Sequence, residues 1–73
     1  MFFKRKNQKP IETIRNLQKI LSDESESIRV CMKAAEIAKN EGCNEAAQLI
    51  TEVLKDEKMH KLKVEQMLIN LRS

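Results

Sequence analysis

The sequence predicts an all-α fold, a two-helix antiparallel hairpin. The chain has 73 residues with one glycine, one proline and 34% charged residues, which excludes a domain of several strands and tight turns. Apolar residues recur at helical spacing over two long stretches, and a glycine lies between these stretches. We expect helix 1 over about residues 10–41, a turn over 42–44 and helix 2 over about 45–72.

The first helix is expected to begin at Pro10, because proline has no amide hydrogen to lose in a first helical turn. The serine-rich stretch 22–27 weakens this helix, because serine and aspartate side chains compete for backbone hydrogen bonds. We expect the helix to continue through it, because the apolar stripe keeps its phase on both sides. The stripe consists of Ile11, Ile14, Leu17, Leu21, Ile28, Cys31, Ala35 and Ala38.

The second helix is expected to follow Gly42, which is typical of a helix C-terminus. Asn44 is predicted to cap its N-terminus, with Glu45 in the first turn. Its predicted apolar stripe consists of Leu49, Ile50, Val53, Val64, Met67, Leu68 and Leu71.

A hairpin of two helices has only one line of contact, so it cannot cover both apolar stripes. A chain this short also buries only about 60% of its unfolded surface. We therefore expect a homodimer or a higher homo-oligomer, in which two hairpins form an antiparallel four-helix bundle.

Positive charge is concentrated near the N-terminus. Four basic residues precede the first acidic one, whereas the chain from Pro10 onward has ten basic and eleven acidic residues. Residues 1–9 are predicted to be a flexible basic tail on the hairpin of residues 10–73. Alternatively, the segment MFFKRK tethers the chain weakly to a membrane surface or a polyanion. The nearly neutral body gives no reason to expect nucleic-acid binding.

We expect a cytoplasmic protein without a transmembrane segment. No apolar run approaches the roughly 20 residues that a membrane span needs, and the N-terminus lacks the apolar core of a signal peptide. The two cysteines have no C-x-x-C spacing, which excludes a zinc ribbon. Cys31 is predicted to be a small core residue, with a redox role as the alternative, and Cys43 an exposed thiol.

Three polar residues are expected on the apolar faces. Glu24 lies three residues after Leu21 and four before Ile28, and Glu57 and His60 are three apart on one face of the second helix. With a rise of about 1.5 Å per residue, Glu24 lies roughly 28 Å from the turn. Glu57 and His60 lie roughly 21 and 26 Å from it. All three are therefore expected to face inward within about one helical turn of each other.

These residue types predict a metal site shared by two copies of the chain. A Glu on one helix level with Glu-x-x-His on its neighbour is half of a di-iron carboxylate site in a four-helix bundle. Two copies supply four carboxylates, which balance the charge of two divalent cations. We expect two iron ions per dimer, with manganese or zinc as alternatives. The simpler alternative is that these side chains share a solvated surface and bind nothing.

The spacing of these residues resembles that of the ferritin-like di-iron carboxylate family, in particular a rubrerythrin-type half. The resemblance covers about residues 14–71. It implies that Glu24 caps one metal ion, Glu57 bridges the two ions and His60 binds one of them. Encapsulated ferritins are similar in being two-helix chains that build the site across subunits. The matching segments run from Glu24-Ser25 to Glu41-Gly42 and from Glu45-Ala46-Ala47 to Glu57-Lys58-Met59-His60.

The chain departs from rubrerythrins in several respects. It has two predicted helices where rubrerythrins usually have four. Ser27 occupies the place of their additional carboxylate, and Cys31 that of a tyrosine found in many relatives. No rubredoxin-like cysteine cluster is present, so electrons would come from a separate, unknown donor.

The resemblance implies a ferroxidase or peroxidase-type oxidoreductase that oxidises Fe(II) with oxygen or peroxide, in iron handling or oxidative-stress protection. No catalytic side chain is expected beyond the metal ligands. The alternative is a metal-free helical interaction or adaptor module that dimerises or docks a partner helix. Polyanion binding through the basic tail is a third hypothesis, which the neutral body does not favour.

Overall fold

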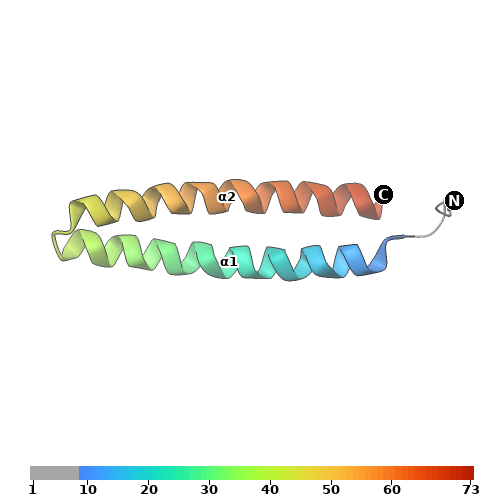
Figure 1. Cartoon of the computed structure of the whole chain (residues 1–73), viewed down its shortest axis with the longest axis horizontal. Helices are drawn as coiled ribbons and strands as arrows, with labels where there is room; N and C mark the ends of the chain where they lie inside the picture. Colours follow the sequence, from blue (N-terminus) through green and yellow to red (C-terminus); the bar gives the residue numbers. More distant parts are fainter. Residues whose placement is uncertain (1–8) are drawn as a thin grey trace, which may run out of the picture.

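The structure, a computed structural model, describes residues 9–73 as two long helices joined by a tight turn (Figure 1). Helix α1 spans Ile11–Asn40 and helix α2 spans Asn44–Arg72, and this part of the chain contains no strand. The helices lie side by side and antiparallel, so the predicted two-helix hairpin is confirmed. Neither helix has an apolar stretch of the length that a bilayer crossing requires.

The basic tail predicted over residues 1–9 lies outside the described residues, apart from Lys9. Lys9 lies at the open end of the hairpin, where its Nζ donates a hydrogen bond of 2.6 Å to the backbone carbonyl of Arg72.

The turn is a Schellman motif at the C-terminus of α1. The amide of Cys43 donates to the carbonyl of Ala38 at 2.8 Å, and the amide of Gly42 donates to the carbonyl of Lys39 at 3.1 Å. Gly42 has a φ of 78°, in the left-handed region that residues with a β-carbon adopt only at a cost. Gly42 therefore ends α1 and allows the chain to reverse.

The N-terminus of α2 differs by one position from the prediction. Cys43 occupies the N-cap position, and no side chain caps the helix, so the prediction that Asn44 is the cap was wrong. The amide of Ala47 makes the first helical hydrogen bond of α2, to the carbonyl of Cys43 at 2.9 Å. Helix α1 runs without interruption through residues 22–27, because packing against α2 on both sides of this stretch outweighs its weak helix preference.

The side chains that face the neighbouring helix follow alternating spacings of three and four residues, the pattern of an antiparallel coiled coil. We call these half-buried or buried residues the seam. Within residues 9–73, only Ala38, Ala47 and Leu68 are at most 9% exposed, so the core of a single hairpin is small. The seam consists of Ile14, Leu17, Leu21, Glu24, Ile28, Cys31, Ala35 and Ala38 in α1, and Ala47, Ile50, Leu54, Glu57, Lys61, Val64, Leu68 and Leu71 in α2.

The apolar stripe predicted for helix 1 matches the seam except at Ile11, which is exposed. The stripe predicted for helix 2 was partly wrong. Leu49, Val53 and Met67 lie outside the seam and are 61%, 41% and 47% exposed. The reason is that α2 carries apolar residues on two neighbouring faces, and helical spacing alone does not say which face meets α1.

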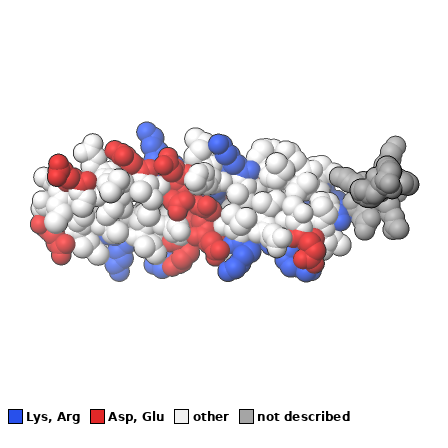
Figure 2. All heavy atoms as spheres, in the orientation of Figure 1, with Lys and Arg blue, Asp and Glu red and all other residues white. Residues whose placement is uncertain are grey.

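Charged side chains are spread over most of the hairpin. In the view of Figure 2, acidic side chains form a band across the middle of the molecule, and uncharged side chains make up most of the remaining surface. The middle of the hairpin is therefore its most acidic region on this face.

Replacing Gly42 with alanine is expected to lower the free energy of unfolding by about 1 kcal/mol, because a β-carbon disfavours a positive φ. No atom lies within 4 Å of the place of that β-carbon, so the backbone alone accounts for the loss. Urea denaturation followed by circular dichroism measures it. Gly42→Asn should lose less, because asparagine tolerates left-handed backbone better. An alanine variant as stable as the wild type would contradict the turn geometry.

Leu68 is 3% exposed, whereas the next residue, Ile69, is 59% exposed. Leu68→Ala is therefore expected to lower the free energy of unfolding by about 2–3 kcal/mol, through lost burial and a cavity at the seam. Ile69→Ala should change it by about 0.5 kcal/mol or less. Equal losses in the same urea experiment would mean that α2 packs through a different face.

Candidate metal centre

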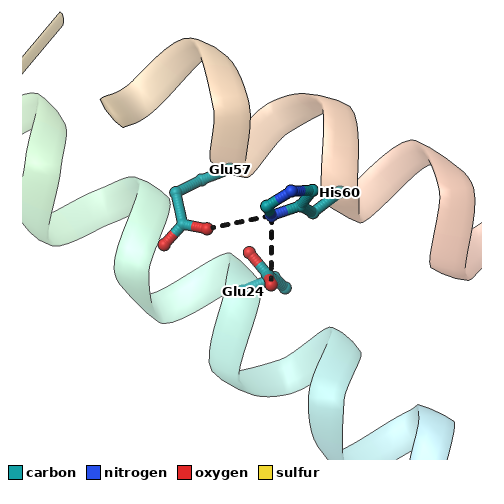
Figure 3. A group of neighbouring side chains, drawn as sticks. All are labelled: Glu24, Glu57 and His60. Carbon is teal, nitrogen blue, oxygen red and sulfur yellow. Dashed lines mark ion pairs between the residues drawn. The ribbon is translucent and has the colours of Figure 1, made fainter. Parts of the chain in front are cut away.

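Glu24, Glu57 and His60 lie together between the two helices (Figure 3). We call these residues the triad. Each offers one ligand atom, and these atoms all lie within 4.8 Å of one another. Nδ1 of His60 is 3.5 Å from Oε1 of Glu57 and 3.9 Å from Oε2 of Glu24. The three residues predicted as ligands are thus in one place, and residues 9–73 hold no second such group of histidine, cysteine and acidic side chains.

Helical periodicity places each member of the triad. Glu24 is the fourth of eight seam residues in α1, and Glu57 is the fourth of eight in α2. Because the helices are antiparallel, both positions lie near the middle of the hairpin. His60 follows Glu57 by three residues and therefore neighbours it on the helix surface. It directly precedes the seam residue Lys61, which places it at the edge of the seam.

The carboxylates and the imidazole differ in exposure. The side chains of Glu24 and Glu57 are 18% and 22% exposed, whereas that of His60 is 56% exposed. The inward orientation predicted for all three holds for the two glutamates, but His60 lies at the edge of the seam. In Figure 3 its ring lies beside both carboxylates. The triad is therefore open to one side of the hairpin.

The neighbouring carboxyl of Glu57 disturbs the ionisation of Glu24. A hydrogen bond with the carboxyl of Glu57 raises the pKa of Glu24, and burial and the negative charge of Glu57 raise it further. His60 opposes this rise when it is protonated. Oε1 of Glu24 is buried without a hydrogen-bond partner among the described residues. A buried acceptor without a donor is unfavourable, so this oxygen would gain from a proton or a cation.

The donor set fits a divalent transition metal. Carboxylate oxygen and imidazole nitrogen together suit iron or manganese, and also zinc. The unpartnered oxygen of Glu24 is a free acceptor within the triad. One hairpin supplies only three such side chains, which is half of the set in dinuclear sites of four-helix bundles.

Lys61 is a seam residue beside the triad that the sequence reasoning missed. It is half-buried, and counted from the open end of the hairpin it occupies the same level as Glu24. No ion pair joins Lys61 to a carboxylate in the described part of the chain. The signal that reveals it is its spacing of seven residues from the seam residues Leu54 and Leu68. A single lysine in such a core can fix the register of a coiled coil.

The two cysteines have separate surroundings. Cys31 is a half-buried seam residue, two seam positions from Glu24 toward the turn, and Cys43 is exposed in the turn. Both are free thiols. Neither belongs to the triad, so the candidate ligands are two carboxylates and one imidazole.

No family model, curated protein or solved structure matches this chain significantly. The residues and geometry of the triad are therefore the main indication of function in the described chain.

The raised pKa of Glu24 predicts that the metal-free protein loses stability as the pH rises. A carboxyl whose pKa is higher in the folded chain holds more protons when folded, so its contribution is fully present below the usual value of 4.5. That contribution is lost as the pH rises through the raised value. In the presence of a chelator, Glu24→Gln should therefore gain in Tm relative to the wild type as the pH increases.

Glu26→Gln is the matched control, because Glu26 is exposed on the same helix and a hydrogen bond from Arg29 lowers its pKa. Glu26→Gln should show no such gain toward higher pH. Thermal unfolding followed by circular dichroism measures both variants. If the Tm of Glu24→Gln and the Tm of the wild type depend on pH in the same way, the raised pKa of Glu24 is contradicted.

Proposed function

We propose that two copies of this chain bind a pair of iron ions through the triad of each copy and oxidise Fe(II) with oxygen or peroxide. The observation that supports this proposal most strongly is the convergence of two carboxylates and an imidazole from opposite helices within 4.8 Å. The buried, unpartnered Oε1 of Glu24 supports it further, because a cation would satisfy this atom. Iron handling and protection against peroxide are the roles that fit.

The roles of the side chains follow the resemblance to ferritin-like proteins. Glu57 would bridge the two ions, Glu24 would bind one ion as a terminal ligand, and His60 would bind one through its imidazole. Four carboxylates from two copies offset the positive charge of two divalent ions, so little net charge is buried. Fe(II) held by these residues would supply the electrons that reduce the oxidant.

Proton binding at Glu24 is coupled to metal binding. The raised pKa of Glu24 favours its protonated form, and a metal ion needs the deprotonated carboxylate. A metal ion would therefore compete with protons for this carboxylate, and metal binding should weaken as the pH falls. The ligand oxygens of the two glutamates lie within 4.8 Å of each other, which is close enough for both to contact one ion.

The alternative is a metal-free helical module that dimerises or docks a partner helix. Lys61 favours this alternative, because it is half-buried at the level of Glu24 and brings a positive charge from the protein itself. Glu24, Glu57 and Lys61 would then form a polar layer that fixes the register of the helices. The two hypotheses differ in whether the triad takes up metal stoichiometrically.

An anaerobic Fe(II) titration of the metal-free chain should saturate near one iron per chain, because each copy supplies half of a two-ion site. Admission of air should then produce the near-ultraviolet absorbance of oxidised iron. Glu57→Ala should weaken iron binding by about tenfold or more, because it removes the proposed bridging ligand.

Glu52→Ala is the control for that titration, because Glu52 is an exposed glutamate on the same helix and outside the triad. It should bind iron like the wild type, and circular dichroism should show that both variants remain helical. Identical titrations of the wild type, Glu57→Ala and Glu52→Ala would exclude the metal site and leave the metal-free module. Parallel titrations with Mn(II) and Zn(II) compare the alternative metals.

A further inference from the structure

One long side of the hairpin carries apolar side chains that no described part of the chain covers. We call this side the open face. Its six large apolar side chains are between 41% and 61% exposed. They are Ile20, Val30 and Ile37 in α1, and Leu49, Val53 and Met67 in α2.

Helical geometry puts these side chains on the same side of the seam. Ile20, Val53 and Met67 each directly precede a seam residue. In an antiparallel pair, positions that precede a seam residue lie on the same side in both helices. Val30, Ile37 and Leu49 likewise directly precede the seam residues Cys31, Ala38 and Ile50, so all six lie on one side of the seam.

The opposite side of the seam is different in character. Charged side chains dominate there, and they include Arg29, Glu36 and Lys39 in α1 and Lys55 and Lys58 in α2. The hairpin therefore has a mainly apolar flank, which also carries the exposed Asp23, Asp56 and Lys63, and a mainly charged flank, which also carries Leu62 and Ile69. An exposed apolar surface that runs along both helices is typical of an interaction site.

The triad opens onto the apolar side. His60 lies midway between Val53 and Met67, seven residues from each, so all three share one side of α2. It is also the exposed member of the triad, at 56%. A partner that covers the open face would therefore also enclose the triad.

We infer that the open face is the surface on which a second copy of this chain docks, so that the two triads meet across the interface. This inference deepens the proposed function and rests on it for the sharing of metal ions between the triads. A second copy is the occupant that completes the triad, because it brings the same two carboxylates and imidazole to the same place.

The position of the triad along the hairpin fits a second copy. Glu24 and Glu57 are each the fourth of eight seam residues, so the triad lies midway between the turn and the open end. Two hairpins whose triads meet therefore overlap over their full length, whichever way the second hairpin runs. If the triad lay near one end, two hairpins running in opposite directions could bring their triads together only with partial overlap.

The size of the open face also fits a stable dimer. Two helices of this length lying abreast present a face about 45 Å long and about 20 Å wide. This is about 900 Å² per copy, compared with about 800 Å² per partner in a standard interface. A single hairpin has only three buried core residues, so the dimer would supply the larger part of the core.

Sedimentation velocity of the full chain tests the inference, with a chelator and with a reducing agent that prevents cross-linking through Cys43. The wild type should be dimeric. Leu49→Gln/Val53→Gln should raise the Kd of the dimer by about 100-fold or more, because each copy loses two buried apolar side chains. Neither residue belongs to the triad, and the change adds no charge.

The matched control is Leu62→Gln/Ile69→Gln. These residues lie on the same helix, are 61% and 59% exposed, and face the charged flank. The control should remain dimeric. A monomeric wild type, with and without Fe(II), would overturn the inference. A control that dissociates while the open-face variant stays dimeric would overturn it as well.

If Leu49→Gln/Val53→Gln is unfolded, the thermal unfolding of the wild type tests the inference instead. Its Tm must rise with protein concentration if folding and pairing through the open face are coupled, and a constant Tm would overturn the inference.

Failure of the proposed function is distinguishable from failure of the interface. A dimer held by the open face whose Glu57→Ala variant binds iron normally keeps the interface and excludes the metal site. A monomer that still binds iron through its triad excludes the interface and the shared two-ion site, but keeps the triad as a metal-binding group.

Discussion

The structure depends on an apolar seam that is interrupted at its middle by two carboxylates. Apolar burial between α1 and α2 holds the hairpin together, but only three residues of this seam are at most 9% exposed. Glu24 and Glu57 weaken it, because their hydrogen bond and partial burial raise the pKa of Glu24 and oppose its ionisation. A proton or a cation removes this cost. Stability and protonation are therefore coupled at the triad.

Each helix carries two apolar faces, and the triad lies where they meet. The seam joins the two helices of one hairpin, while the open face, with Leu49, Val53 and Met67 in α2, remains uncovered. His60 borders the open face, and the glutamates belong to the seam. Assembly through the open face would thus change the surroundings of all three side chains at once, so pairing and metal affinity should influence each other.

The positive charge of Lys61 has opposite consequences for the metal-binding and the metal-free hypotheses. Lys61 is half-buried at the level of Glu24, but no ion pair joins it to a carboxylate in the described residues. Its positive charge would strengthen a metal-free polar layer that includes Glu24 and Glu57. The same charge would repel a bound cation and weaken its binding.

Local chemistry is enough to predict most of this fold and the members of the candidate site. Three local features carry this prediction: the helical spacing of apolar residues, a glycine suited to positive φ, and the Glu-x-x-His spacing. Each depends on only a few neighbouring residues. The constant rise per residue of a helix then places Glu24 level with Glu57 and His60. The choice of face on α2 needs the neighbouring helix. Leu49 and Val53 are as apolar as Leu54 and Leu68, and only the packing against α1 decides which of them are buried. That choice also puts Lys61 into the seam and leaves His60 at its edge, because a rotation of α2 about its axis moves all of these residues together.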